Sequence, residues 1–235
     1  MDYSWLQPGH ENFMVSFSFW FATAVMLAST VFFVMERNEV SAKWKTSLSV
    51  ATLVTGIAFW HYLYMSKMWF APGESPLALR YVDWLITVPL QIVEFYLILA
   101  AVTVVSTGLF WQLLGASLVM LLGGFMGEAC SGYAMPGFII GMLGWLYVLY
   151  LIFMGEASNV NSGSGSEASQ KAFNALRLVV LIGWSIYPIG YYFGNFGMGV
   201  NETSHMTNII YNFADLINKA AFGLFIWAAA KSESK

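Results

Sequence analysis

The sequence predicts an all-α membrane protein, a bundle of seven transmembrane helices with its N-terminus outside. Hydrophobic residues fill 58% of the 235 positions and charged residues only 10%, and the mean hydropathy is +0.65. A soluble domain carries about 25% charged residues. Seven apolar runs are long enough to cross a hydrocarbon core of about 30 Å. Backbone polar groups must be paired inside a bilayer, so each run is expected to be a helix, and residues 1–235 are expected to form a single domain.

The first four runs lie close together in the chain. Phe13–Met35 is long enough to span, so we expect a membrane helix there and not a cleavable signal peptide. Thr46–Met68 follows a basic connection. Leu77–Ala100 and Thr103–Met126 are nearly continuous, and Ser106–Thr107–Gly108 is the candidate turn between them.

The last three runs are separated more clearly. Gly137–Met154 is followed by a Gly/Ser-rich segment, Gly155–Gln170, which we expect to be a mobile loop. Phe173–Gly194 contains Pro188, which is expected to kink or loosen its helix. Ile209–Ala230 is the seventh run and has polar residues at both ends.

Lysine and arginine positions predict the orientation, because cytoplasmic loops carry an excess of both. With the N-terminus outside, the outer side holds Lys67 alone. The inner side then holds Arg37, Lys43, Lys45, Lys171, Arg177, Lys231 and Lys235. The small net charge of −3 gives no reason to expect a nucleic acid partner. The single cysteine, Cys130, cannot form an internal disulfide.

A lysine at bilayer depth is the most informative residue of the chain. Lys219 stands about eleven residues, roughly 16 Å, from either end of the seventh run, too far for easy snorkelling. Asp215 lies four residues before it. A desolvated lysine can lose its proton and form a Schiff base with an aldehyde, so we expect Lys219 to carry covalent chemistry. The alternative is a lysine neutralised by Asp215 for helix packing alone.

The third run carries a row of polar groups that includes Arg80, Asp83, Thr87 and Glu94. Eleven residues separate the two carboxyl groups, close to whole helical turns, so they share a face at about 16 Å along the axis. Opposite charge from Arg80 and Lys219 favours the ionised form of Asp83, whereas apolar neighbours favour a protonated Glu94. The pair therefore predicts a proton relay. Each acid alone could instead be a hydrogen-bonded packing group.

Aromatic residues accompany these polar groups. Trp84 neighbours Asp83, and Trp184, Tyr187 and Tyr191 recur at three and four residues in the sixth run, which places them on one helix face. Such stripes are often packing or interface belts. Together with a buried lysine, they could enclose a flat conjugated ligand.

Several segments resemble the microbial rhodopsins, and specifically the proteorhodopsins. They are RYVDWLITVPLQIVEFYLILA (Arg80–Ala100), GWSIYPIGY (Gly183–Tyr191), DLINK (Asp215–Lys219) and FWHYLYM (Phe59–Met65). The similarity extends over all seven runs. It implies the microbial rhodopsin fold, with all-trans retinal bound to Lys219 as a protonated Schiff base, and no metal site.

The resemblance also implies roles for the polar residues. Asp83 matches the primary counterion and proton acceptor, Asp215 the second counterion, and Arg80 the residue that supports the outward side. Glu94 matches the cytoplasmic proton donor. Asp83, Thr87 and Glu94 together match the triplet of bacterial outward proton pumps.

His61 matches the family histidine that hydrogen-bonds the proton acceptor, and the alternative is a core histidine with satisfied hydrogen bonds. Family members assemble as pentamers or hexamers, in which that histidine lies close to a neighbouring subunit's tryptophan, here matched by Trp20. Residues expected to line retinal are Trp84, Gln91, Met120, Gly124, Gly141, Trp145, Trp184, Tyr187, Pro188 and Tyr191. Gln91 stands where glutamine marks blue-absorbing members and leucine marks green-absorbing ones, so the resemblance implies a blue-absorbing protein. The outer loop offers only Glu202 in place of the extracellular glutamate pair of archaeal pumps, so no proton-release group is assigned.

The expected function is a light-driven outward proton pump in the inner membrane of a bacterium, a transporter and not an enzyme. A photosensor that signals to a partner is the alternative, although the chain has no transducer-like helix pair. A retinal-free transporter or receptor, with Lys219 in a salt bridge, is a third possibility and would show no visible absorbance.

Overall fold

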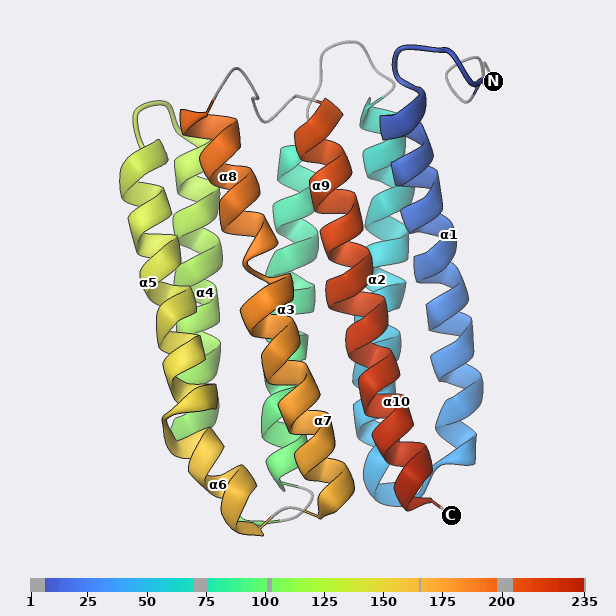
Figure 1. The fold of residues 1–235 in the computed structure, drawn as a ribbon, viewed down its shortest axis with the longest axis vertical. Helices are drawn as coiled ribbons and strands as arrows, with labels where there is room; N and C mark the ends of the chain where they lie inside the picture. The colour runs from blue at the N-terminus through green and yellow to red at the C-terminus, as the bar shows by residue number, and fades with distance from the viewer. Residues whose placement is uncertain (1–6, 70–75, 101–102, 165, 198–204, 235) are drawn as a thin grey trace.

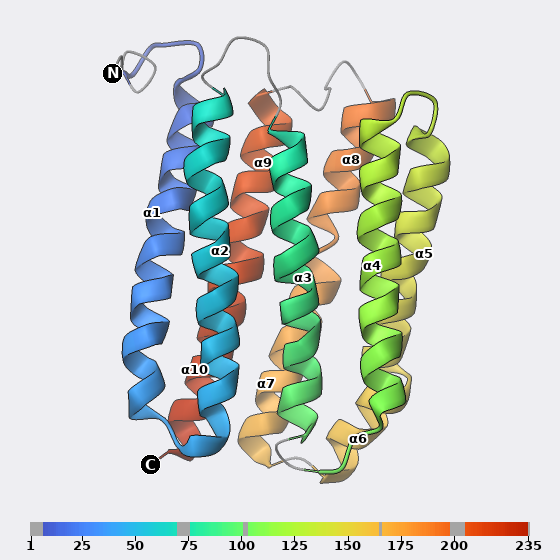
Figure 2. The same ribbon diagram turned by 180° about the vertical axis from the view of Figure 1, so that it is seen from behind.

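The computed structural model describes residues 7–69, 76–100, 103–164, 166–197 and 205–234 of the chain. Seven helices within these ranges are long and apolar enough to cross a membrane, which confirms the predicted bundle. The helices run nearly parallel to one long axis. The first span begins at one end of this axis, and the last span ends at the other (Figures 1 and 2). The spans comprise α1 (Phe13–Glu36), α2 (Lys45–Trp69), α3 (Leu77–Ala100), α4 (Thr107–Ala129), α5 (Ala134–Phe153) with α6 (Glu156–Ser164), α7 (Glu167–Leu178) with η4 (Val179–Gly183) and α8 (Ile186–Phe196), and α9 (His205–Asp215) with η5 (Leu216–Ala221) and α10 (Phe222–Glu233).

Polar side chains face the inside of this bundle, and large apolar side chains face outward. Arg80, Asp83, Glu94, Asp215 and Lys219 are each no more than 2% exposed. Large apolar residues on several spans are around half exposed. A protein in lipid has no hydrophobic reason to hide its apolar surface, so this distribution fits a multi-pass membrane protein.

Glycines allow α4 and α5 to approach each other closely. A Cβ atom added to Gly144 would lie 2.7 Å from the backbone N of Met120 and 2.8 Å from the backbone O of Ala116. No larger residue fits there without moving a helix. Small residues at such contacts allow the close backbone packing on which membrane helices depend.

The start of α4 corrects one predicted boundary. The fourth run was expected to begin at Thr103, but the helix begins at Thr107. Ser106 is its N-cap, and the side-chain Oγ accepts a hydrogen bond from the backbone N of Leu109 at 3.1 Å. A serine cap satisfies one of the free N–H groups at a helix start, so α4 begins inside the predicted turn Ser106–Thr107–Gly108, whose last two residues are already helical.

The prediction of a loop over Gly155–Gln170 is wrong. Residues Glu156–Ser164 form α6, and α7 already begins at Glu167. Local polar contacts explain the difference, because the hydroxyl of Ser166 caps α7 by accepting from the backbone N of Ser169 at 3.2 Å, and Lys171 pairs with Glu167 at 2.6 Å.

The sixth and seventh spans each contain a π-helical turn, η4 and η5, near their middle. In η4 the backbone N of Trp184 donates to the O of Val179, five residues back, at 3.1 Å. The turn lies just before Pro188, where the sequence predicted a kink or loosening. π-turns inside α-helices occur frequently at functional sites. Here η5 contains Lys219 itself.

Candidate functional site

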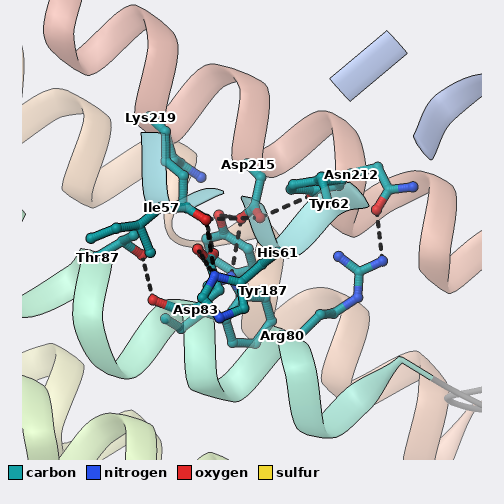
Figure 3. A network of polar contacts seen from close by, with 12 residues as sticks. Ile57, His61, Tyr62, Arg80, Asp83, Thr87, Tyr187, Asn212, Asp215 and Lys219 are labelled. Carbon is teal, nitrogen blue, oxygen red and sulfur yellow. Dashed lines mark hydrogen bonds and ion pairs between the residues drawn. The ribbon is translucent and has the colours of Figure 1, made fainter. Parts of the chain in front are cut away.

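Lys219 lies between two buried carboxylates in the middle of the bundle. Its Nζ contacts Oδ2 of Asp83 on α3 and lies 2.9 Å from Oδ2 of Asp215 (Figure 3). All three side chains are at most 2% exposed. A buried cation is strongly destabilising unless it is paired, so one amine and two acids make a mutually dependent group.

The two acids differ in how well they are satisfied. Besides Lys219, Asp215 accepts hydrogen bonds from the hydroxyl of Tyr62 at 2.9 Å, the indole N of Trp84 at 3.1 Å and the hydroxyl of Tyr187 at 2.6 Å. Donors of this kind favour the charged form of a carboxylate. Oδ1 of Asp83, in contrast, has no hydrogen-bond partner among the described residues. Asp83 is therefore the acid with an oxygen free to accept a proton.

His61 approaches this free oxygen but hydrogen-bonds elsewhere. Its Nδ1 lies 3.6 Å from Oδ1 of Asp83 and 2.9 Å from the backbone O of Ile57, one turn earlier on α2. The hydrogen bond to the acceptor that the resemblance implies is thus replaced in this structure by one to the backbone. The ring remains close enough to interact electrostatically with Asp83.

Thr87 and Arg80 lie on the same helix as Asp83 but do not contact its carboxylate. The hydroxyl of Thr87 donates to the backbone O of Asp83 at 2.9 Å. The guanidinium of Arg80 points away from the acid pair (Figure 3). Its Nη2 donates to the amide oxygens of Asn208 at 2.9 Å and Asn212 at 2.6 Å.

Aromatic faces complete the surroundings of Arg80. Its Cζ lies 5.4 Å from the ring centroid of Phe19 and 5.6 Å from that of Tyr211. The interaction of a desolvated guanidinium with ring faces is favourable. Asn208 and Asn212 were missed in the sequence, although they share with Asp215 and Lys219 a spacing of four, three and four residues along one helix face.

Glu94 is isolated in apolar surroundings. It is fully buried, and neither carboxyl oxygen has a hydrogen-bond partner among the described residues. Ser47 on α2, which is also buried, is a polar neighbour. A carboxyl group without a cation or donor is far more stable in the neutral form when buried. The structure thus places a buried acid without a cationic partner about 16 Å along α3 from Asp83.

A partly open cavity lies beside the Lys219 group, with about 690 Å³ of space not filled by atoms, a figure that includes open solvent. Its apolar and aromatic lining is typical of a site for a small apolar ligand. Trp84 and Tyr187 line it and also donate to Asp215, so the cavity adjoins the acids that hold Lys219. The lining residues are Tyr81, Trp84, Val88, Met120, Leu121, Gly124, Gly137, Phe138, Gly141, Met142, Trp145, Trp184, Tyr187, Pro188, Tyr191 and Tyr211.

Of the residues expected to line a chromophore, Gln91 does not line this cavity. Its side chain is buried and donates from Nε2 to the backbone O of Asn218, the residue before Lys219. Tyr81 and Val88 were missed, although they lie three residues before and four after Trp84 on the same face of α3. The remaining missed lining residues belong to α4, α5 and α9.

Comparison with known proteins decides the family. A model of the family described as bacteriorhodopsin-like protein matches residues 13–233. The chain belongs to this family. A blue-light absorbing proteorhodopsin from Gamma-proteobacterium Hot 75m4 is 54% identical, covering 94% of this chain and 87% of the relative. A green-light absorbing proteorhodopsin from Gamma-proteobacterium EBAC31A08 is also 54% identical, covering 92% and 86%.

Solved structures of bacteriorhodopsin-like proteins agree in fold. The crystal structure of a blue light-absorbing proteorhodopsin from Med12 has a TM-score of 0.82 and 58% identity, covering 93% of this chain and 98% of that chain. Xanthorhodopsin, described as a light-driven ion pump with dual chromophore, has a TM-score of 0.80 and 30% identity, covering 94% and 93%. The blue-absorbing relative and the blue light-absorbing solved structure support the expected blue-absorbing type.

Membership of the bacteriorhodopsin-like family implies a retinal chromophore. The cavity fits such a group, because its wall is apolar and aromatic and two of its lining residues, Trp84 and Tyr187, donate to the acid that pairs with the buried amine of Lys219. Several lining side chains are fixed by their own hydrogen bonds: the indole N of Trp145 donates to the O of Val180 at 3.1 Å and the hydroxyl of Tyr191 to the O of Ala134 at 2.7 Å.

One further acid of this bacteriorhodopsin-like protein lies near the cavity. Glu128, on the last turn of α4, accepts hydrogen bonds from the hydroxyls of two lining residues, Tyr81 and, at 3.4 Å, Tyr211. Spacing along the chain does not indicate this contact, because its three residues come from three different helices. Glu202, the acid that the sequence offered in the outer loop, lies outside the described residues.

Proposed function

We propose that this chain is a light-driven proton pump that carries protons outward, with all-trans retinal bound to Lys219 as a protonated Schiff base. One observation supports this most: the nitrogen of Lys219 lies between a well-satisfied acid, Asp215, and an acid with a free oxygen, Asp83, while Glu94 is isolated further along α3. The description of xanthorhodopsin as a light-driven ion pump supports the same function.

Each residue has a distinct part in the proposal. Retinal, when bound, supplies light absorption and the change of shape that follows it. Asp83 accepts the proton of the Lys219 nitrogen, because its Oδ1 is free and its Oδ2 touches that nitrogen. Asp215 keeps its charge, because three neutral donors and Lys219 stabilise it. Glu94 then returns a proton to the nitrogen.

The direction of transport depends on which end of the bundle is outside. We propose that the N-terminus is outside, since the positive charges are concentrated in the connections on the opposite side. Asp83 then faces the exterior and Glu94 the cytoplasm. Moving one charge against the membrane potential requires about 2.3 kcal/mol per 100 mV, which the absorbed light must supply.

We also propose that the protein lies in the inner membrane of a bacterium and forms a homo-pentamer or homo-hexamer. Trp20 on α1 is 39% exposed on the outer surface of the bundle, where a neighbouring subunit can contact it. The side chain of His61 is 12% exposed and lies 3.6 Å from Asp83. An interface that includes both residues would connect neighbouring acceptor sites.

The proposal is tested by measuring external pH around cells that express the protein and are supplied with retinal. Illumination should acidify the medium, and a protonophore that makes the membrane permeable to protons should abolish the signal. A protein with full visible absorbance that changes no pH in either direction would instead be a photosensor.

Glu94→Gln should slow the return of a proton to the Lys219 nitrogen, because glutamine cannot supply one. A positioned general acid contributes about 100-fold or more in rate, so a slowing of that order is expected. Flash photolysis at pH 7 measures this return through the recovery of the visible band. Glu167→Gln serves as the control, because this acid is largely exposed at the start of α7 and should leave the rate unchanged. An unchanged rate in Glu94→Gln would remove Glu94 from the pathway.

Gln91→Leu should move the visible absorption maximum to longer wavelength. A polar group near the polyene stabilises the localised ground-state charge more than the excited state, so its loss narrows the energy gap. One hydrogen bond of about 1–2 kcal/mol corresponds to roughly 10–20 nm at visible photon energies. Gln112→Leu is the control, since the Gln112 amide accepts from Tyr147 on the exposed surface of the bundle and should not affect colour. A maximum that stays in place, or moves to shorter wavelength, would contradict the assignment of Gln91.

A further inference from the structure

A side-chain hydrogen bond joins the two π-helical turns beside Lys219. Asn218, on η5, donates from Nδ2 to the backbone O of Gly183, on η4, at 2.9 Å. The local backbone explains why this oxygen is available. In a regular α-helix the backbone N of Tyr187 would donate to the O of Gly183. Pro188 has no N–H to give to the O of Trp184, so the backbone N of Tyr187 donates to the O of Trp184 instead, at 3.2 Å. The O of Gly183 accepts from the neighbouring span.

The same asparagine is tied to a third helix. Its backbone O accepts from Nε2 of Gln91 on α3, and both residues are about 1% exposed. Because π-helical turns leave some backbone carbonyls without their usual helical partners, side-chain amides are needed to satisfy them inside a membrane. Asn218 thus joins the third, sixth and seventh spans at the residue that precedes Lys219.

Gly183 and Asn218 also fit each other in shape. A Cβ atom at Gly183 would overlap the amide oxygen of Asn218 and lie 3.0 Å from its Cγ. A side chain at position 183 would therefore force the Asn218 amide to move from its hydrogen bond with the backbone O of Gly183. This makes the pair testable, because the loss of stability caused by a side chain at position 183 depends on which residue occupies position 218.

The position of this bridge relates it to the return of the proton. Between Glu94 and the contacts of Lys219, α3 presents the buried Gln91 and Thr87, and Gln91 is bound to Asn218. Oδ1 of Asn218 is buried and has no hydrogen-bond partner among the described residues, so it is an acceptor that a water molecule could use. A proton travelling from Glu94 to the Lys219 nitrogen passes this bridge.

We infer that Asn218 is a positioning residue, whose bond to Gly183 ties the sixth span to the seventh and restrains the passage from Glu94 to Lys219. The inference rests on the proposed pump function. Breaking the tie makes it easier for the two turns to separate and admit water. The net contribution of one such hydrogen bond predicts that the return of the proton becomes faster by about two- to tenfold, while transfer to Asp83 keeps its rate.

Two variants of Asn218 test this by flash photolysis. Asn218→Leu removes the donor with little change in shape, and Asn218→Ala removes the side chain, so a folding defect in one does not prevent the test. Both should return the proton faster with an unchanged rate of transfer to Asp83. Asn195→Ala is the matched control, because its amide also donates to a backbone carbonyl, that of Tyr191 at 3.0 Å, but within a single helix. If Asn218→Leu and Asn218→Ala only lower the unfolding temperature and leave the return rate as it was, the inference fails.

A double-mutant cycle on the retinal-free protein supplies a readout that does not depend on pumping. Gly183→Ala should lower the unfolding temperature clearly in the native background and much less in Asn218→Ala, where the overlapping amide is gone. Equal losses in both backgrounds would overturn the pairing of Gly183 with Asn218. If the unaltered protein moved no protons in light while this cycle behaved as expected, the pump proposal would fail and the bridge would stand as a structural tie alone.

Discussion

Lys219→Ala is expected to abolish both the visible colour and all light-driven pH change. Lys219 is the amine that lies buried between Asp83 and Asp215, and the aromatic cavity adjoins it through Trp84 and Tyr187. Alanine offers no nitrogen for a covalent link to an aldehyde. Removing the cation also leaves two buried acids without their partner, which typically costs about 3–5 kcal/mol, so this variant should be less stable as well.

Lys219→Arg separates chemistry from folding. Arginine keeps a positive charge between the two acids, yet its guanidinium does not deprotonate in proteins and cannot form the Schiff base. The variant should retain more of the helical fold than Lys219→Ala and should also remain colourless. Lys171→Ala is the matched control, since Lys171 is an exposed residue paired with Glu167 on α7. Absorption spectra recorded after addition of retinal compare the visible band of the three variants. A normal visible band in Lys219→Arg would refute the covalent role of Lys219.

The sequence alone predicted the seven spans and the group around Lys219 for the same physical reason. Charged residues at bilayer depth are rare and must find partners, so Lys219, Asp215 and Asp83 were expected to meet, and the structure brings them together. The shared face of Asp83 and Glu94 also followed from helical periodicity. The Asp215–Lys219 pair and the shared face of Asp83 and Glu94 needed only spacing within one helix, and the pairing with Asp83 needed only the rule that a buried charge must find a partner.

Features that depend on several helices could not be read from spacing. The hydroxyl of Tyr62 reaches Asp215 from α2, and nothing in the surrounding run marks it as different from other tyrosines. The π-helical turn around Lys219 does not change the apolar pattern of the sequence, so the hydrogen bond between Asn218 and Gly183 could not be predicted from it. The Gly155–Gln170 segment was expected to be a loop because small polar residues dominate it. Its helices depend on the Ser166 cap and on tertiary contacts such as the hydrogen bond of Ser106 to Glu156.

Asp83→Asn is expected to abolish proton transport while leaving the protein folded and coloured. Asparagine occupies nearly the same space but cannot accept a proton at neutral pH. Lys219 would still be paired with Asp215, which keeps its three other donors, so the buried cation is not left alone. Because a general base contributes about 100-fold or more, light-driven acidification should fall below about 1% of the unaltered rate.

The spectrum of Asp83→Asn provides an independent readout of the same contact. Losing a negative charge beside the Lys219 nitrogen destabilises the ground-state positive charge, so the visible maximum should move to longer wavelength. Asp83→Glu is the matched variant, because it restores a carboxylate and should recover part of the transport. Acidification that persists in Asp83→Asn would mean that another group accepts the proton. Asp215 would then be the first to examine, because its Oδ2 lies 2.9 Å from the same nitrogen.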